Sequence, residues 1–378
     1  MLGGAGGAGG AGGAGGAGGA GGAGGAGGAG GAGVSRWYGG YGTSLTTGAL
    51  IANRDGIAGS WLGALYGGAQ YPTETLGHLE RWEPWVRAAV FDFDLLSHLQ
   101  YSQHTEGGKE SFTLWHTEAD DTTAPPTVAC SRIATLIRPP DATFVAQLDL
   151  VEAYADLRED RAGEVLAELG PPIAFWSSIV HLHPDHKRWT LELIDAALRL
   201  ANWVEMRFKH SLACRRPVEY SGQIQPIILT PGHSSLPSGH ATEAFLVAYL
   251  LRQLIPNIDF NWSEQLMRQA NRIAVNRTVA GVHFPIDSAA GQTLGLTLGE
   301  YFVHRCRAAD SYTDFYPWRF DGQLYLPGDD FDWRLQYDAP NDLHTDTAFA
   351  YVIPSEPTTA QPSGFLNWLW GKAAAEWT

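Results

Sequence analysis

The sequence is poor in cysteine, in basic residues and in long apolar runs. Its three cysteines, Cys130, Cys214 and Cys306, are too widely spaced for a disulfide framework or a zinc module, and they point to a reducing compartment. With 25 Lys and Arg residues against 40 Asp and Glu, the net charge is -15. General nucleic-acid binding needs a basic face, so we expect no nucleic-acid partner. Apolar runs such as Ala244–Leu251 fall well short of the roughly 18 to 20 residues that span a bilayer, so we expect a soluble protein without a membrane span.

The N-terminal end lacks any side chain larger than a methyl group. Gly3 to Ala32 repeat Gly-Gly-Ala without interruption, and such a segment cannot bury a core. It is a tail, a linker or a placeholder for other residues, so residues 1–33 are set apart as low complexity. No signal peptide is visible, but the repeat stands where one would be, so the localisation stays open. Residues 34–378 are expected to form a single large helical domain.

The remaining chain predicts a mainly α fold built as helix bundles. Residues 37–84 indicate irregular structure with one or two short helices, and Thr113 to Pro140 indicate a loop because threonine and proline cluster there. From there to Arg307 apolar residues recur at helical spacing. No βαβ alternation is present. After Tyr312 the chain is aromatic and loop-rich, which suits a cover over a helical core or a homo-oligomer contact. Predicted helices cover 148–169, 189–212, 239–255, 263–280 (with Ser263 as the cap) and 285–304.

Three short segments carry residues suited to chemistry. In the first, Lys209 lies near a helix end and Arg216 precedes Pro217, so two cations can converge on one oxyanion. The alternative is a solvated basic helix end. In the second, Ser238, Gly239 and His240 stand at a helix start, where free backbone N–H groups and the dipole favour an anion. The alternative there is a serine N-cap with an incidental histidine.

The third segment runs from Asn276-Arg277 to His283 and Asp287. Arg277 is a further cation, and a carboxylate four residues after His283 can hold one imidazole nitrogen and leave the other free as a ligand or nucleophile. The alternative is a surface His–Asp pair. The oxyanion site is thus expected within residues 200–290.

Taken in order, Lys-x6-Arg-Pro, Pro-Ser-Gly-His and Arg-x5-His-x3-Asp resemble the signature of the type-2 phosphatidic acid phosphatase superfamily, which includes the vanadium-dependent haloperoxidases. The resemblance covers Lys209 to Asp287 by motif and Val145 to Arg307 by general helical pattern. The third segment usually opens with Ser-Arg, and here it reads Asn276-Arg277, a conservative change beside the ligand. The resemblance implies the helix-bundle architecture of the haloperoxidases and acid phosphatases.

The resemblance also implies a role for each position. Vanadate, or phosphate in the same site, would be held by Lys209, Arg216, Arg277, Ser238 and the Gly239 amide. His283 would bond vanadium, or attack phosphorus in a phosphatase, and Asp287 would orient it. His240 would be the general acid–base. The vanadium would act as a Lewis acid that makes bound peroxide able to oxidise a halide.

The motif does not by itself separate a haloperoxidase from a phosphatase, because vanadate mimics phosphate. We expect a vanadate-dependent haloperoxidase using hydrogen peroxide, a halide and a small organic substrate, with a soluble acid phosphatase using His283 as the alternative. His233, seven residues before His240, resembles algal bromoperoxidases and favours bromide and iodide. Met206 departs from the tryptophan that both groups tend to carry.

Readings from other classes remain open. The spacing of His181, His183, Asp185 and His186 is that of a two-metal hydrolase and makes a zinc site the main rival. Its alternative is a polar helix start introduced by Pro184. A Ser238 triad lacks the Gly-x-Ser-x-Gly elbow. A non-catalytic assembly protein with a relic site is the last reading.

Overall fold

The computed structural model describes residues 44–60, 72–106, 108–120, 122–256, 260–307, 315–338, 340–341, 343–354 and 360–378. The expected boundary at residue 33 therefore lies outside the described residues. The chain divides into two compact units, Met1–Arg87 and Ala88–Thr378. In the first unit the structure describes α5 (Ser44–Ile57) and the short 3-10 helix η1 (Leu76–Arg81). The second unit contains the candidate site.

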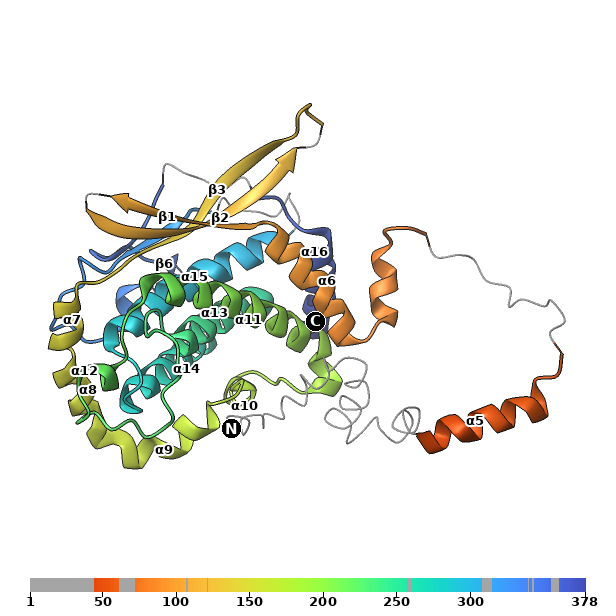
Figure 1. Cartoon of the computed structure of the whole chain (residues 1–378), viewed down its shortest axis with the longest axis horizontal. Helices are drawn as coiled ribbons and strands as arrows, with labels where there is room; N and C mark the ends of the chain where they lie inside the picture. The colour runs from red at the N-terminus through yellow and green to blue at the C-terminus, as the bar shows by residue number, and fades with distance from the viewer. Residues whose placement is uncertain are drawn as a thin grey trace. The chain divides into compact units, whose positions relative to one another are not determined.

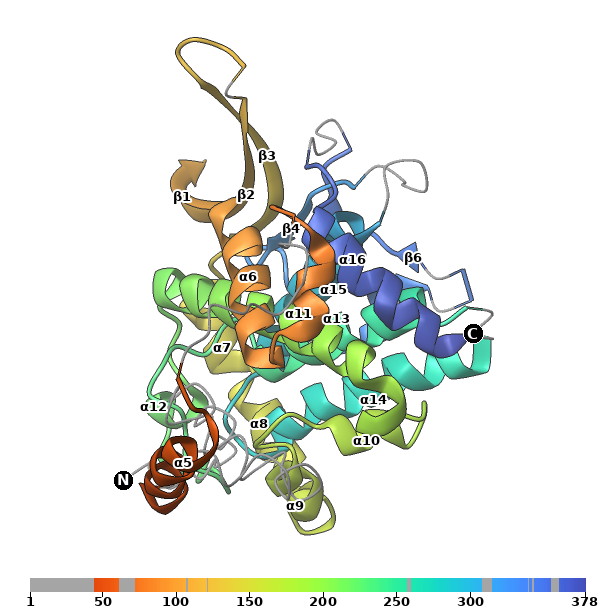
Figure 2. The same cartoon turned by 90° about the vertical axis from the view of Figure 1, so that its right-hand side faces the viewer.

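The second unit is centred on the helix α15 (Pro285–Cys306), in which every residue except Glu300 is buried. Around it lie α11 (Pro184–Leu212), α13 (Gly239–Leu254) and α14 (Phe260–Val279), which all contact it, and α13 also contacts α11 and α14 (Figures 1 and 2). Shorter helices precede them, namely α6 (Pro84–Ser97), α7 (Asp141–Ala146), α8 (Leu148–Tyr154), η2 (Ala155–Leu157), α9 (Arg158–Ala167) and α10 (Ile173–Ser177). The helix α12 (Pro217–Tyr220) follows α11, and α16 (Gly364–Ala374) with η5 (Ala375–Trp377) closes the chain.

A row of glycines lets α13 and α15 approach closely. A methyl group at Gly291 would lie 2.7 Å from the Ser238 carbonyl oxygen, and one at Gly299 would lie 2.9 Å from the ring of Tyr249. Gly295 stands between them on the same face and would clash with the backbone of Thr242. Because small residues line this contact, the start of α13 is brought against the start of α15. The Ser238 amide accordingly donates to the Asp287 carbonyl oxygen at 2.9 Å.

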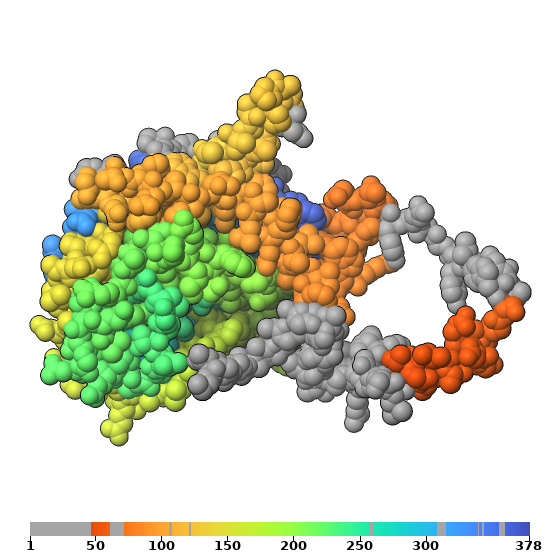
Figure 3. All heavy atoms as spheres, in the orientation of Figure 1, coloured from red at the N-terminus to blue at the C-terminus, as the bar shows by residue number. Residues whose placement is uncertain are grey.

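The expectation of a loop between Thr113 and Pro140 is wrong. The strands β2 (Lys109–Asp120) and β3 (Thr127–Ile137) fill most of it, and the threonine and proline cluster marks only the turn between them. They belong to a five-stranded sheet of order β1-β2-β3-β4-β7, with β1 (Leu99–Glu106), β4 (Trp318–Asp321) and β7 (Ala350–Val352). The pairs are antiparallel except β3 with β4. The outer ends of β2 and β3 are exposed and project beyond the helices (Figure 3).

The sheet corrects the expected pure helix bundle to a mainly helical unit with a mixed sheet. Packing explains the sheet, since its inner half buries Phe112, Leu114, Ile133 and Leu136. The aromatic tail also holds regular structure, including the 3-10 helix η4 (Trp333–Leu335), the two-stranded pair β5 (Tyr337–Asp338) and β6 (Leu343–His344), and α16.

The expected helices are confirmed with shifted ends. Helix α14 begins at Phe260, so Ser263 is buried inside it and is not its cap. The expected helix 148–169 is divided into α8, η2 and α9. Within the described residues, no helix is long and apolar enough to cross a membrane.

Candidate active site

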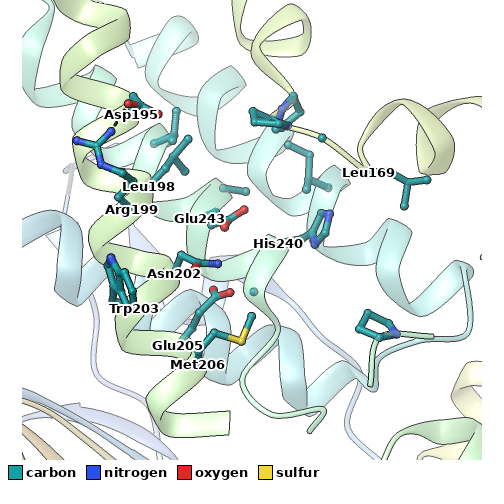
Figure 4. Close-up of a pocket in the computed structure, with 18 of the residues that line it drawn as sticks. Leu169, Asp195, Leu198, Arg199, Asn202, Trp203, Glu205, Met206, His240 and Glu243 are labelled. Atoms are coloured by element: carbon teal, nitrogen blue, oxygen red, sulfur yellow. Dashed lines mark hydrogen bonds and ion pairs between the residues drawn. The ribbon is translucent and has the colours of Figure 1, made fainter. Parts of the chain in front are cut away.

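A cavity of about 550 Å³ opens between α11, α13 and the chain around α10 (Figure 4). Much of its wall is apolar, and its inner end is polar. Six of the residues singled out from the sequence line it, namely Lys209, Arg216, His233, Gly239, His240 and His283. Tertiary packing has therefore brought the three sequence segments to one place, and Ser238, Asp287 and Arg277 lie buried next to this lining.

His283 is held by Asp287 at the start of α15. Asp287 Oδ2 lies 3.0 Å from His283 Nδ1 and also accepts from the Phe284 amide at 2.9 Å and from the Ser235 hydroxyl. Nδ1 therefore donates, and the lone pair of the imidazole is on Nε2. Burial, followed by the charge of Arg216, lowers the pKa of His283 well below its usual value, so the ring is neutral.

Arg216 contacts the free nitrogen of that ring. Its Nη1 lies 2.9 Å from His283 Nε2 and 2.8 Å from the Val282 carbonyl oxygen. The same side chain holds His233, with Nε 2.9 Å from its carbonyl oxygen and Nη2 3.0 Å from its Nδ1. Arg216 thus joins the nucleophile-like nitrogen to the loop that precedes α13.

Lys209 lies near the end of α11, which stops because Ala213 adopts a left-handed conformation with φ 50°. Its Nζ donates to the carbonyl oxygens of Ser235 (3.0 Å) and Pro237, which leaves one of its three N–H donors for a ligand. Burial lowers the pKa of Lys209 to about 8, and the attraction of Glu205 opposes that effect.

Arg277 is a buried cation with hydrogen-bond donors that remain for an anion. It is 1% exposed, and its Nη2 contacts the carboxylate of Glu168, but its Nε and Nη1 have no hydrogen-bond partner among the described residues. Buried guanidinium nitrogens rarely remain without an acceptor, so these two nitrogens can donate to a bound oxyanion. Asn276 Nδ2 donates to Glu168 Oε1 at 2.8 Å, so the departure from Ser-Arg has a role in holding the carboxylate that faces Arg277.

The segment from Ser238 to His240 begins α13. The Ser238 hydroxyl accepts from the Ala241 amide at 3.4 Å, so it is an N-cap, and its hydrogen is not used in that bond. His240 Nε2 lies 2.8 Å from the Glu168 carbonyl oxygen. Burial, followed by the charge of Arg277, lowers the pKa of His240 to about 3, so the ring is neutral before an anion binds.

His233 lies on the exposed side of the cation cluster. Besides Arg216, its Nδ1 lies 3.2 Å from the Ser234 carbonyl oxygen, and partial burial lowers its pKa. The structure therefore places His233 beside the cations, while its effect on halide preference stays a prediction.

Four residues of the site were not found from the sequence. They are Glu168, Glu205, Ser235 and Glu243. Glu205 carried a usable signal, because it stands one helical turn before Lys209 and so shares its face. The sequence around Glu168 gave no such signal, because its partner Arg277 is distant in the chain.

The rival zinc site is wrong for the described residues. The rings of His181, His183 and His186 lie with centroids 5.7 to 6.1 Å apart. No group of three or more His, Cys, Asp or Glu side chains in the described part of the chain is placed to hold a metal ion. Instead, His183 caps α11 by accepting from the Asp185 amide at 3.2 Å, as the polar helix start predicts.

Comparison with known proteins finds similarity over the residues that carry this site. Residues 194–309 match the model of the PAP2 superfamily. Among solved structures, the chain is similar to a transmembrane PAP2 type phosphatidylglycerolphosphate phosphatase from Bacillus subtilis, with 18% identity and a TM-score of 0.34. That similarity covers 44% of this chain and 89% of the other. No curated protein matches the sequence.

The side chains present fit a tetrahedral or trigonal oxyanion such as phosphate or vanadate. Positive charge and hydrogen-bond donors come from the unpartnered nitrogens of Arg277, the remaining N–H of Lys209 and the start of α13. His283 Nε2 supplies a lone pair at the same place. The site can therefore bind an anion and attack or ligate its central atom.

Proposed function

We propose that the protein hydrolyses phosphomonoesters, with His283 as the nucleophile. One observation carries this proposal: the neutral imidazole of His283 donates through Nδ1 to Asp287 and presents Nε2 to the cationic end of the cavity. A nucleophile oriented by a carboxylate beside anion-binding groups is the arrangement that phosphoryl transfer to histidine needs. The PAP2 superfamily match over residues 194–309 supports the same class of reaction.

In the first step, Nε2 of His283 attacks phosphorus and the ester P–O bond breaks. The oxygen of the leaving alcohol takes a proton from His240, which lines the cavity. His240 is neutral without an anion because burial, followed by the charges of Arg277, Lys209 and Arg216, lowers its pKa. A bound phosphate dianion compensates those three charges, so the pKa of His240 rises and the ring becomes able to donate.

In the second step, water replaces the histidine on phosphorus. Neutral His240 takes one proton from the attacking water, and the P–N bond breaks with its electron pair returning to Nε2 of His283. Lys209, Arg216 and Arg277 stabilise the charge on the non-reacting oxygens in both steps. Arg216 now donates to Nε2 at 2.9 Å, so a phosphate oxygen must take that hydrogen bond before attack.

The cavity favours ester hydrolysis over halide oxidation. Its volume of about 550 Å³ and its apolar wall suit an organic leaving group, which halide oxidation does not require. We therefore place the phosphatase first, ahead of the haloperoxidase that the sequence led us to expect.

The vanadate-dependent haloperoxidase stays the second candidate because Arg216 contacts His233 Nδ1 at 3.0 Å. The residues that would hold vanadate are Lys209, Arg216, Arg277, Ser238 and Gly239, with His283 as the ligand to vanadium. Vanadate, when bound, would supply Lewis-acid activation of hydrogen peroxide. This chain's residues would orient the anion, and His233 and His240 would share the protons of the bound oxygens.

Two assays on the full chain separate the candidates. The first follows release of p-nitrophenol from p-nitrophenyl phosphate, with orthovanadate as inhibitor. The second follows oxidation of iodide and bromide by hydrogen peroxide after loading with orthovanadate. Phosphate release that orthovanadate inhibits, without halide oxidation, is the expected result. Halide oxidation in the absence of any phosphate release would overturn the hydrolytic proposal.

A further inference from the structure

Two carboxyl groups from different helices line the cavity. Glu205 extends from α11 and Glu243 from α13, and both point into the space that His240 also faces (Figure 4). Glu205 is only 2% exposed, and its Oε2 has no hydrogen-bond partner among the described residues. Its Oε1 lies against Gly239, where an added methyl group would come within 2.6 Å of it. The pair therefore adjoins the backbone on which the phosphate is expected to rest.

The cations around these two carboxyl groups are also engaged by other anionic groups. Arg199, which lines the same cavity, is bonded to Asp92 at 2.7 Å and to Asp195. Lys209 attracts both Glu205 and Glu243, and Arg216 attracts Glu205, but the proposed phosphate needs both of these cations. Burial and mutual repulsion raise the pKa of Glu205 well above its usual value, and burial raises that of Glu243 to about 7. An unpartnered buried carboxyl group is costly unless a ligand or a proton compensates it.

Building on the phosphatase function proposed above, we propose that Glu205 and Glu243 bind an ammonium group of the substrate, so that the preferred substrates are phosphomonoesters of amino alcohols. Because Glu205 adjoins Gly239, the ammonium group lies a short carbon chain away from phosphorus. The remaining wall accommodates apolar parts of the substrate, through Leu169, Ile173, Leu198, Met206 and Val247. An ammonium ion between the carboxyl groups also frees Lys209 for the phosphate.

A binding experiment tests this without depending on turnover. Isothermal titration calorimetry would compare 2-aminoethylphosphonate with ethylphosphonate, which differ only by the amine, at about pH 8, where the carboxyl pair is more ionised. The parent should bind the amino compound about tenfold more tightly, the effect of one charged hydrogen bond. Glu243→Gln should reduce that preference to less than about twofold while keeping affinity for ethylphosphonate.

Glu205→Gln is the second variant, so that misfolding of one of them does not decide the result. Glu152→Gln makes the same chemical change at an exposed position of α8 and should keep the full preference. Equal affinity for the two phosphonates in the parent, or a preference that survives both substitutions, would overturn the ammonium site alone. That outcome would indicate that the carboxyl pair takes up a proton instead. Failure of inorganic phosphate and both phosphonates to bind would overturn the phosphatase proposal together with it.

Discussion

Asp287 Oδ2 lies 3.0 Å from Nδ1 of His283 across one turn at the start of α15, and this contact decides which imidazole nitrogen faces the cavity. Because the carboxylate accepts from Nδ1, the lone pair of the ring is on Nε2. Asp287 also accepts from the Phe284 amide, so a residue in the first turn of the helix caps the helix and orients the histidine. The first turn of α15 and the imidazole of His283 are therefore positioned by one side chain.

Asp287→Asn should lower kcat/KM for p-nitrophenyl phosphate by about 100-fold or more. An asparagine amide can donate to Nδ1 and so favour the imidazole tautomer with a proton on Nε2, which cannot attack phosphorus. Steady-state kinetics measures the loss, and the thermal unfolding midpoint separates it from misfolding. A well-folded variant with parental kcat/KM would show that His283 is not the nucleophile.

Arg277→Ala should weaken phosphate binding about tenfold or more, because one charge-assisted hydrogen bond contributes roughly 1.5 to 3 kcal/mol. It should also destabilise the fold, because the buried carboxylate of Glu168 loses its partner. Glu168→Gln added to Arg277→Ala should restore much of the stability without restoring affinity. Calorimetry of phosphate binding and thermal unfolding give the two readouts, and affinity regained in the double variant would contradict the role of Arg277.

The substitutions His283→Ala and His240→Ala should impair different steps of the reaction. The first should abolish the covalent phosphohistidine that acid quenching and mass spectrometry can detect. The second should keep phosphate binding but lower kcat by roughly 10²- to 10⁴-fold, as expected for a general acid–base. The same loss of phosphate affinity in both variants would contradict the division of roles.

The dependence of kcat/KM on pH should be bell-shaped. Burial raises the pKa of Asp287 to about 6, so activity should rise as pH increases through that value and the carboxylate ionises to hold His283. Burial lowers the pKa of Lys209 to about 8, so activity should fall as pH increases further and this cation is lost. Lys209→Arg should shift the alkaline limb upward, since arginine keeps its charge. If the alkaline limb of the variant is not shifted, the loss of activity at high pH is due to the titration of another group.

His233→Phe tests the second candidate function. If vanadate-loaded enzyme oxidises halides, the parent should favour iodide and bromide over chloride, because a histidine beside Arg216 shares hydrogen bonds with bound oxygens. Phenylalanine would make a drier pocket, in which charge interactions are stronger. Steady-state rates with the three halides measure the ranking. An unchanged ranking and pH profile in the variant would exclude this role of His233.

The sequence by itself determined the local parts of the site. Helical periodicity predicts α11, α13 and α15, and short-range spacing places Lys209 at a helix end, Ser238 at a helix start and His283 one turn from Asp287. These features depend on neighbours within a few residues, so they can be predicted from the chain. The zinc reading of His181 to His186 failed because the same spacing also suits an ordinary helix cap.

Only the tertiary structure shows the features that depend on contacts between residues far apart in the chain. Strands β2 and β3 exist because sheet pairing and the core bury residues whose local composition resembles a loop. Glu168 reaches Arg277, and Glu205 meets Gly239 and Glu243, through packing of α9, α11, α13 and α14 that no local pattern encodes. The charges and the volume of the cavity follow from that packing. The proposed preference for an organic phosphate ester depends on both, because long-range contacts determine which charges remain unpaired in the cavity.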